Sequence, residues 1–99
     1  MSYFVYRLIS PRTTFPKDMT DTEAKVMKAH STYWSDLASK KIAIIAGPVL
    51  DPMGMWGLAV VEAKDKSEVS TYVTNDPVIK ANIGFRFEIH PMAQAILRK

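Results

Sequence analysis

One histidine and one aspartate in this sequence have the chemistry of a proton-transfer pair. His30 falls within a predicted helix, and on a wheel of about 100° per residue it lies at the centre of an apolar stripe. Because a buried imidazole needs a hydrogen-bond partner, we expect another group to face His30 inside the protein. The alternative is a core histidine that bonds a backbone carbonyl and has no chemical role. The apolar stripe consists of Val26, Met27, Tyr33, Trp34 and Leu37.

The expected partner of this histidine is Asp76, at the end of a second predicted helix. Asp76 shares the inward face of that helix with Val69 and Val73. A carboxylate at a helix C-terminus opposes the helix dipole by about 0.3–1 kcal/mol. Such a local conflict without visible gain tends to mark a functional site. The alternative is a simple turn at Asn75-Asp76-Pro77, in which the aspartate hydrogen-bonds its own backbone.

If the two side chains pair, each has a defined role in catalysis. His30 is then the general base or acid, while Asp76 holds the ring tautomer and stabilises the imidazolium as it forms. We expect Trp34 to form a wall of the pocket. Arg12, in a proline-flanked loop, is a candidate for binding a ligand carboxylate, and Asp51 for lining the same rim. Residues of these last two types are more often solvated or part of turns.

Other kinds of site have little support in the sequence. A metal would need a third ligand beyond His30 and Asp76, and only His90 and scattered carboxylates remain. Neither a G-x-S-x-G motif nor a phosphate-binding glycine loop is present. The chain has no cysteine, which removes thiolate nucleophiles, disulfides and iron–sulfur clusters. We therefore expect neither a metal nor a cofactor.

Composition indicates one globular domain over residues 1–99, because 47% of the residues are hydrophobic and the length suits a single core. The net charge of +3 favours anionic ligands slightly. The lysines are scattered, so we expect no nucleic-acid partner. No segment approaches the ~20 apolar residues of a membrane span. Arg7 and Arg12 interrupt what would be a secretory signal, and the expected compartment is the cytoplasm.

The patterning predicts six elements in the order β, α, β, β, α, β. A Thr20/Glu23 capping box marks the start of the first helix, and a segment rich in glycine and proline joins the second and third strands. This order is ferredoxin-like: an antiparallel four-stranded sheet of the α+β class, with two helices on one face. The predicted elements are a strand at 3–9, a helix from 20 to about 40, strands at 42–46 and 55–62, a helix from 65 to 75, and a strand at 83–89.

The strands are apolar on nearly consecutive positions, which predicts an apolar surface on the sheet face away from the helices. If this face stayed exposed to water, the protein would lose several kcal/mol of folding free energy, at about 25 cal/mol per Å2 of apolar surface. We therefore expect a homodimer; a wet sheet or a cover formed by the C-terminal tail is the alternative. The residues expected to point away from the helices are Phe4 or Val5, Ile44 or Ile45, and Leu58 or Ala59.

Three runs of the sequence, MKAHSTYWSDL, GPVLDPMGMWG and NDPVIKANIGFRFEIHPM, together resemble the YciI-like (YCII-related) family. The resemblance covers nearly the whole chain and matches His30, Asp76-Pro77 and Gly47-Pro48 to the family pattern. It implies a fold of the dimeric α+β barrel type and a histidine–aspartate dyad in a cleft, while the general activity of the family is unsettled. Lys41 departs from the pattern, because a glycine is usual there and is also the usual helix stop.

The leading hypothesis is a cofactor-independent enzyme that acts on a small anionic organic molecule by proton transfer, as in isomerisation or elimination. A second hypothesis is a ligand-binding or regulatory module in which the same cleft holds a metabolite without turnover. A cofactor-free oxygenase is a third, resting on fold analogy alone. The sequence leaves these three open.

Overall fold

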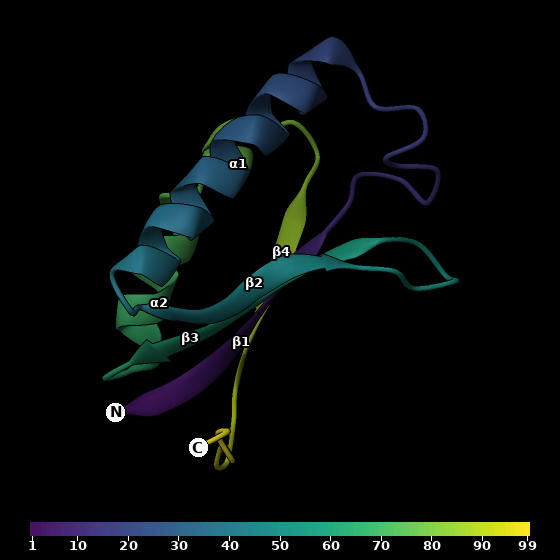
Figure 1. Ribbon diagram of the computed structural model, residues 1–99. Coiled ribbons are helices and arrows are strands. Elements are labelled where there is room, and N and C mark those ends of the chain that lie inside the picture. Colours follow the sequence, from purple (N-terminus) through teal and green to yellow (C-terminus); the bar gives the residue numbers. More distant parts are fainter.

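A four-stranded antiparallel sheet forms one layer of the fold, and the helices cover one of its faces (Figure 1). The computed structural model describes residues 1–99. The strand order is β2-β3-β1-β4, so the ferredoxin-like βαββαβ prediction is confirmed. The strands are β1 (Ser2–Ile9), β2 (Ala43–Val49), β3 (Trp56–Ala63) and β4 (Arg86–Pro91), and the helices are α1 (Asp21–Ser39), α2 (Lys66–Thr74) and α3 (Pro77–Lys80).

Helix α1 has well-defined signals at both ends. At its start, the Glu23 amide donates to the Thr20 hydroxyl at 3.1 Å and the Thr20 amide donates to the Glu23 carboxylate at 2.9 Å, so the predicted capping box is present. At its end, Lys41 has a φ of 64°, in the left-handed region. The Ile42 amide then donates back to the Leu37 carbonyl at 2.9 Å, as in a Schellman motif. Lys41 thus takes the backbone conformation that a glycine adopts more easily.

The core lies between the sheet and the helices. Alternate residues of β1 and β3 are buried on this face, whereas their neighbours in sequence are only half-buried. The apolar stripe predicted for α1 faces this core, with Trp34 and Leu37 buried. The fully packed members of the core include Phe4, Tyr6, Leu8, Ala59, Val61, Ala63, Val69, Val73 and Val78.

Helix α2 ends at Thr74 with Asn75 as its C-cap, which agrees with the predicted end. The short helix α3 was not predicted; it follows at once, with Asp76 as N-cap and Pro77 as its first residue. The last strand begins at Arg86 instead of residue 83, since Asn82 and Gly84 have φ values of 52° and 105° and form a turn. Residues 92–99 form neither helix nor strand.

The sheet face away from the helices is apolar in part. The alternation places Val5 and Leu58 on this face, with Ile45 beside them and 57% exposed, whereas Phe4 and Ala59 point into the core. A bulge in β2 disturbs its pairing between residues 43 and 45. The same face also bears charge: an Arg7 nitrogen lies 3.7 Å from the Glu88 carboxylate. The prediction of a uniformly apolar second face is therefore only partly right.

None of the helices combines the length and the apolar character that crossing a membrane requires.

Candidate active site

The junction between α2 and α3 places Asp76 beneath the middle of α1, where it meets His30. Nδ1 of His30 lies 2.8 Å from Oδ2 and 3.0 Å from Oδ1 of Asp76. The Asp76 side chain is fully buried, and that of His30 is 16% exposed. The predicted pair is therefore present, although its two residues are 46 positions apart in the sequence.

Three further donors converge on the Asp76 carboxylate. Oδ2 accepts from Nε1 of Trp34 at 2.7 Å and from the Tyr6 hydroxyl at 3.0 Å, and Oδ1 accepts from the Val78 amide at 3.0 Å. A buried carboxylate is stable only when its lone pairs are satisfied in this way. The sequence patterns did not predict the roles of Tyr6 and Val78. The only available signal was an inward-facing tyrosine on β1, whose hydroxyl also needs a partner.

The helix-dipole argument for Asp76 took account of only one of the two helices that meet there. Asp76 does follow α2, but it is also the N-cap of α3, where a carboxylate accepts backbone hydrogen bonds. The turn-type hydrogen bond to its own backbone, considered as the alternative, is present as well, in the contact with the Val78 amide. The two interpretations were not exclusive: one oxygen caps the short helix and the other receives Trp34 and Tyr6.

The tautomer of His30 follows from these contacts. Because Asp76 already accepts hydrogen bonds from three other donors, its carboxylate acts as acceptor and Nδ1 of His30 carries the proton that points at it. Nε2 then holds a lone pair and makes no hydrogen bond within the chain. Burial, and next the Asp76 carboxylate, raise the pKa of Tyr6, so its phenol remains a donor.

His30 lines a cleft with a volume of about 480 Å3 between α1 and the sheet. The floor is made of small residues: Ala46 on β2 and Gly57 on β3, where an added Cβ would approach the Leu8 side chain to 3.2 Å. His30 is the only titratable residue among those that line the cleft, and Ser10, Ser31 and Ser35 add hydroxyls. The apolar walls include Leu8, Phe15, Met27, Trp34, Met55 and Phe85. Trp34 thus lies at the predicted wall.

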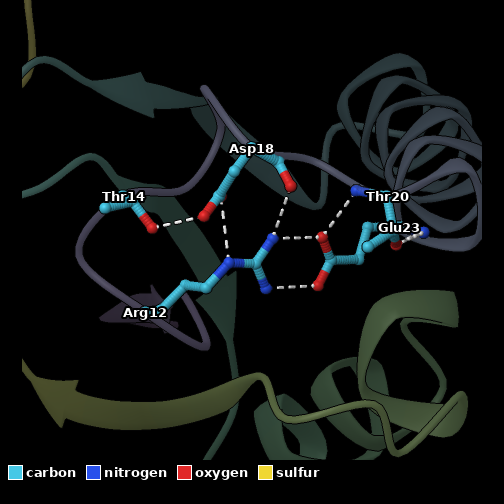
Figure 2. Close-up of polar contacts among 5 residues, drawn as sticks. All are labelled: Arg12, Thr14, Asp18, Thr20 and Glu23. Carbon is cyan, nitrogen blue, oxygen red and sulfur yellow. Dashed lines mark hydrogen bonds and ion pairs between the residues drawn. The ribbon is translucent and has the colours of Figure 1, made fainter.

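Arg12, the expected anchor for a ligand carboxylate, does not line the cleft. Figure 2 shows its guanidinium held by two acidic residues: it donates to both Glu23 oxygens at 2.7 and 2.8 Å and to the Asp18 carboxylate at 2.9 Å. A fourth hydrogen bond goes to the Asp18 carbonyl. Glu23 is itself the capping-box residue of α1. The network therefore fastens the loop after β1 to the start of α1, and this loop carries Phe15 of the cleft wall.

Asp51 does not line the cleft either. It lies in the connection between β2 and β3, where its carboxylate accepts from the Met53 amide at 2.9 Å and from Nε1 of Trp56 at 3.0 Å. These two bonds, with the amide first, lower the pKa of Asp51. Trp56 is among the residues that line the cleft. The Trp56 ring that Asp51 holds lies against Arg7, with the guanidinium carbon 4.9 Å from the ring centroid, on the sheet face away from the helices.

No three side chains of the types that ligate metals come together in this structure. His90, the other histidine, lies on β4 and is exposed; its Nε2 is 3.2 Å from the Glu88 carboxylate. It has no contact with the His30–Asp76 pair.

Fold and site together define a member of the YCII-related domain family: the chain matches that family over residues 1–93 and belongs to it. No curated protein matches the chain at a significant level. Among solved structures, the chain is similar to 5-chloro-2-hydroxyhydroquinone dehydrochlorinase (TftG) from Burkholderia phenoliruptrix AC1100, in complex with 2,5-dihydroxybenzoquinone. The two chains share 25% identity with a TM-score of 0.58, over 89% of this chain and 91% of that chain.

Proposed function

We propose that the protein is a cofactor-independent enzyme that moves a proton on a small organic molecule, in an elimination or an isomerisation. The observation that carries this proposal is the geometry of His30, whose Nδ1 is held by the buried Asp76 while its Nε2 is left without a partner beside the cleft. A base oriented in this way can take a proton from a bound substrate. Asp76 stabilises the imidazolium that results, without itself taking up the proton.

The proposed reaction balances without an oxidant or reductant. In an elimination, Nε2 takes the substrate proton, the electron pair of the broken bond moves into the substrate, and the leaving group departs with its own pair. In an isomerisation, His30 returns the proton at another atom. The similar dehydrochlorinase is named for the loss of hydrogen chloride, and we carry over the elimination class to this chain on that ground.

We propose a substrate with a hydroxylated ring that is uncharged or weakly acidic, in place of the small anionic molecule expected from the sequence. A carboxylate buried in the cleft would need a cation, and the cleft offers none besides His30. Aromatic walls from Phe15, Trp34 and Phe85 suit a planar ring, and the similar protein acts on a hydroxyhydroquinone. Negative charge would develop on the ring only as His30 removes the proton.

The test uses 5-chloro-2-hydroxyhydroquinone as the probe and chloride release as the measurement. The wild-type protein should release chloride, and His30→Gln should lose this activity. His90→Gln is the matched control, because it removes the only other histidine and leaves the cleft untouched. Binding of 2,5-dihydroxybenzoquinone without chloride release would instead favour a binding or regulatory module. Equal activity of the His30→Gln variant would contradict the proposed base.

We also infer that two copies associate through the sheet face away from the helices. Ile45 is exposed there beside Val5 and Leu58, and Nε of Arg7 on the same face is buried without a hydrogen-bond partner. A second copy would cover this surface. Light scattering should give about twice the mass of one chain at micromolar concentration; a monomer would contradict the inference. A chain without cysteine also suits the reducing cytoplasm, where we place it.

A further inference from the structure

We propose that Tyr6 and Trp34 are positioning residues that set how tightly His30 holds its proton, by hydrogen-bonding the Asp76 oxygen that His30 also uses. The proposal rests on the function proposed above, since it concerns the basicity of the same histidine. Neither residue reaches a reacting atom through this contact; both act through Asp76.

The geometry brings three donors to a single oxygen. Oδ2 of Asp76 accepts from Nδ1 of His30 at 2.8 Å, from Nε1 of Trp34 at 2.7 Å and from the hydroxyl of Tyr6 at 3.0 Å. Trp34 lies one turn after His30 on α1, so the same helix supplies two of the donors. Tyr6 comes from the central strand β1. The network therefore ties the sheet, α1 and the α2–α3 junction together at one atom.

The two donors also fix each other. The rings of Tyr6 and Trp34 stack with centroids 5.2 Å apart, and both side chains are almost completely buried. Tyr33, the next residue on α1, packs edge-on against Trp34 at 5.6 Å. Its own hydroxyl donates elsewhere, to the Tyr72 carbonyl at 2.6 Å. Neither donor can swing away from Asp76 without disturbing this aromatic packing.

The electrostatic consequence has a definite sign. Each donor points the positive end of its dipole at the carboxylate, which offsets part of the negative potential felt by His30. Removing one donor restores that potential, so the imidazolium becomes more stable and the ring titrates at higher pH. A residue with a purely structural role would lower the free energy of unfolding without moving this titration.

Few other ionisable groups can confuse the measurement. Tyr6 from β1 contacts Asp76, and Tyr33 from α1 lies close enough that Asp76 contributes to raising its pKa, after burial. No residue of β2 or β3 that lines the cleft is titratable, and from the segment before β4 only Phe85 lines it. The titration of His30 therefore reports mainly on Asp76 and on the donors that Asp76 receives.

The experiment compares the pH midpoint of the His30 ring titration by NMR in the wild-type protein and four variants. Tyr6→Phe and Trp34→Phe each remove one donor and keep a ring in the core. Tyr33→Phe is the matched control, because it removes a partly buried tyrosine hydroxyl that does not touch Asp76. Asp76→Asn removes the carboxylate charge itself.

We expect Tyr6→Phe and Trp34→Phe to raise the midpoint by roughly half a pH unit or more, Tyr33→Phe to leave it in place and Asp76→Asn to lower it. The acid limb of the pH–rate profile should move in the same directions. A midpoint in Tyr6→Phe equal to or below that of the wild type overturns the positioning role. If Tyr6→Phe does not fold, the same criterion applies to Trp34→Phe: a His30 midpoint equal to or below that of the wild type overturns the positioning role. The acid limb of the pH–rate profile of Trp34→Phe is the second measurement, and it should shift in the same direction as the midpoint.

The two levels of the proposal fail separately. If Asp76→Asn titrates like the wild type, His30 and Asp76 are not coupled and the proposed function falls. If Asp76→Asn shifts the midpoint and the two donor variants do not, the dyad stands and only the role of Tyr6 and Trp34 is lost.

Discussion

Two buried carboxylates join helix α1 to neighbouring segments, and they differ in the basic side chain that each one faces. Glu23 at the start of the helix faces the guanidinium of Arg12, and Asp76 beneath its middle faces the imidazole of His30. Each carboxylate also accepts a backbone amide, from Thr20 and from Val78 respectively. Up to this point the two arrangements use the same physical chemistry.

The difference lies in which partner can release a proton. A guanidinium stays protonated at any pH at which the protein is folded, so the Arg12–Glu23 network can only hold structure. An imidazole changes charge near neutrality, and His30 keeps one nitrogen free beside the cleft, so its network can do chemistry. A buried carboxylate by itself is therefore a poor marker of an active site. Whether its network can transfer a proton depends on the proton affinity of its partner and on the access of that partner to the cleft.

The largest expected effect follows from changing the carboxylate of the second network. Asp76→Asn keeps the shape but removes the charge that orients and stabilises His30, and we expect activity on the chlorinated probe to fall by about 10²- to 10⁴-fold. Chloride release measures this loss. Glu23→Gln, the same chemical change in the first network, should leave the His30 titration midpoint where it is. A shift there would mean that the two networks are coupled through α1.

A second comparison concerns stability. Arg12→Met removes two of the three hydrogen bonds that the Glu23 carboxylate accepts and leaves Oε2 without a partner, so we expect the melting temperature to fall by several degrees. Lys40→Met is the control, because it breaks an exposed pair with Asp36 at the other end of α1 and should change little. Thermal unfolding followed by circular dichroism gives both values. If the melting temperature fell equally in both variants, the burial of Glu23 would not make its ion pair more stabilising than an exposed one.

The acid side of the stability curve gives a smaller effect. The hydrogen bonds from Arg12, followed by the Thr20 amide, lower the pKa of Glu23 from 4.5 to about 2. A carboxyl whose folded pKa is depressed contributes stability above its unfolded value, and this contribution is lost as the pH falls from about 4.5 toward about 2. The difference in urea stability between wild type and Glu23→Gln should therefore shrink over this range. If the difference in stability stayed constant over this pH range, the effect of Glu23→Gln would come from packing and not from the charge of Glu23.

How far the sequence predicts these features depends on whether the signal is local. The capping box at Thr20, the inward stripe around His30 and the succession of the four strands and two longer helices along the chain all rest on spacings of a few residues, and the structure has them. The partner of Arg12 was not predictable in the same way. A charged residue in a loop looks like a ligand-binding group until its neighbours in space are known, and Glu23 was already assigned to the helix cap.

Asp76 illustrates a mixed case. Its inward placement was predicted from the face that it shares with Val69 and Val73, and the structure has it. The dipole argument was incomplete, because a one-turn helix follows that no periodicity can reveal in four residues. Trp34 was assigned to the apolar stripe and to the pocket wall, and neither assignment predicts the hydrogen bond of its indole nitrogen; Tyr6 was given no role beyond its place in the first strand. These hydrogen bonds join side chains from three separate elements, so no pattern within a single segment predicts them.

The smallest expected effect lies at the C-terminal end of α1, outside both networks. Lys41 sits at φ 64°, where a Cβ costs about 1 kcal/mol or somewhat more relative to glycine. Lys41→Gly relieves this cost but makes the unfolded chain more flexible, so we expect a net gain in unfolding free energy of up to about 1 kcal/mol. Lys41→Ala keeps the Cβ and should show no such gain. Because neither change touches His30, Asp76 or Glu23, the His30 titration should stay fixed in both. A loss of stability in the glycine variant would show that the lysine side chain contributes something here that the backbone argument omits.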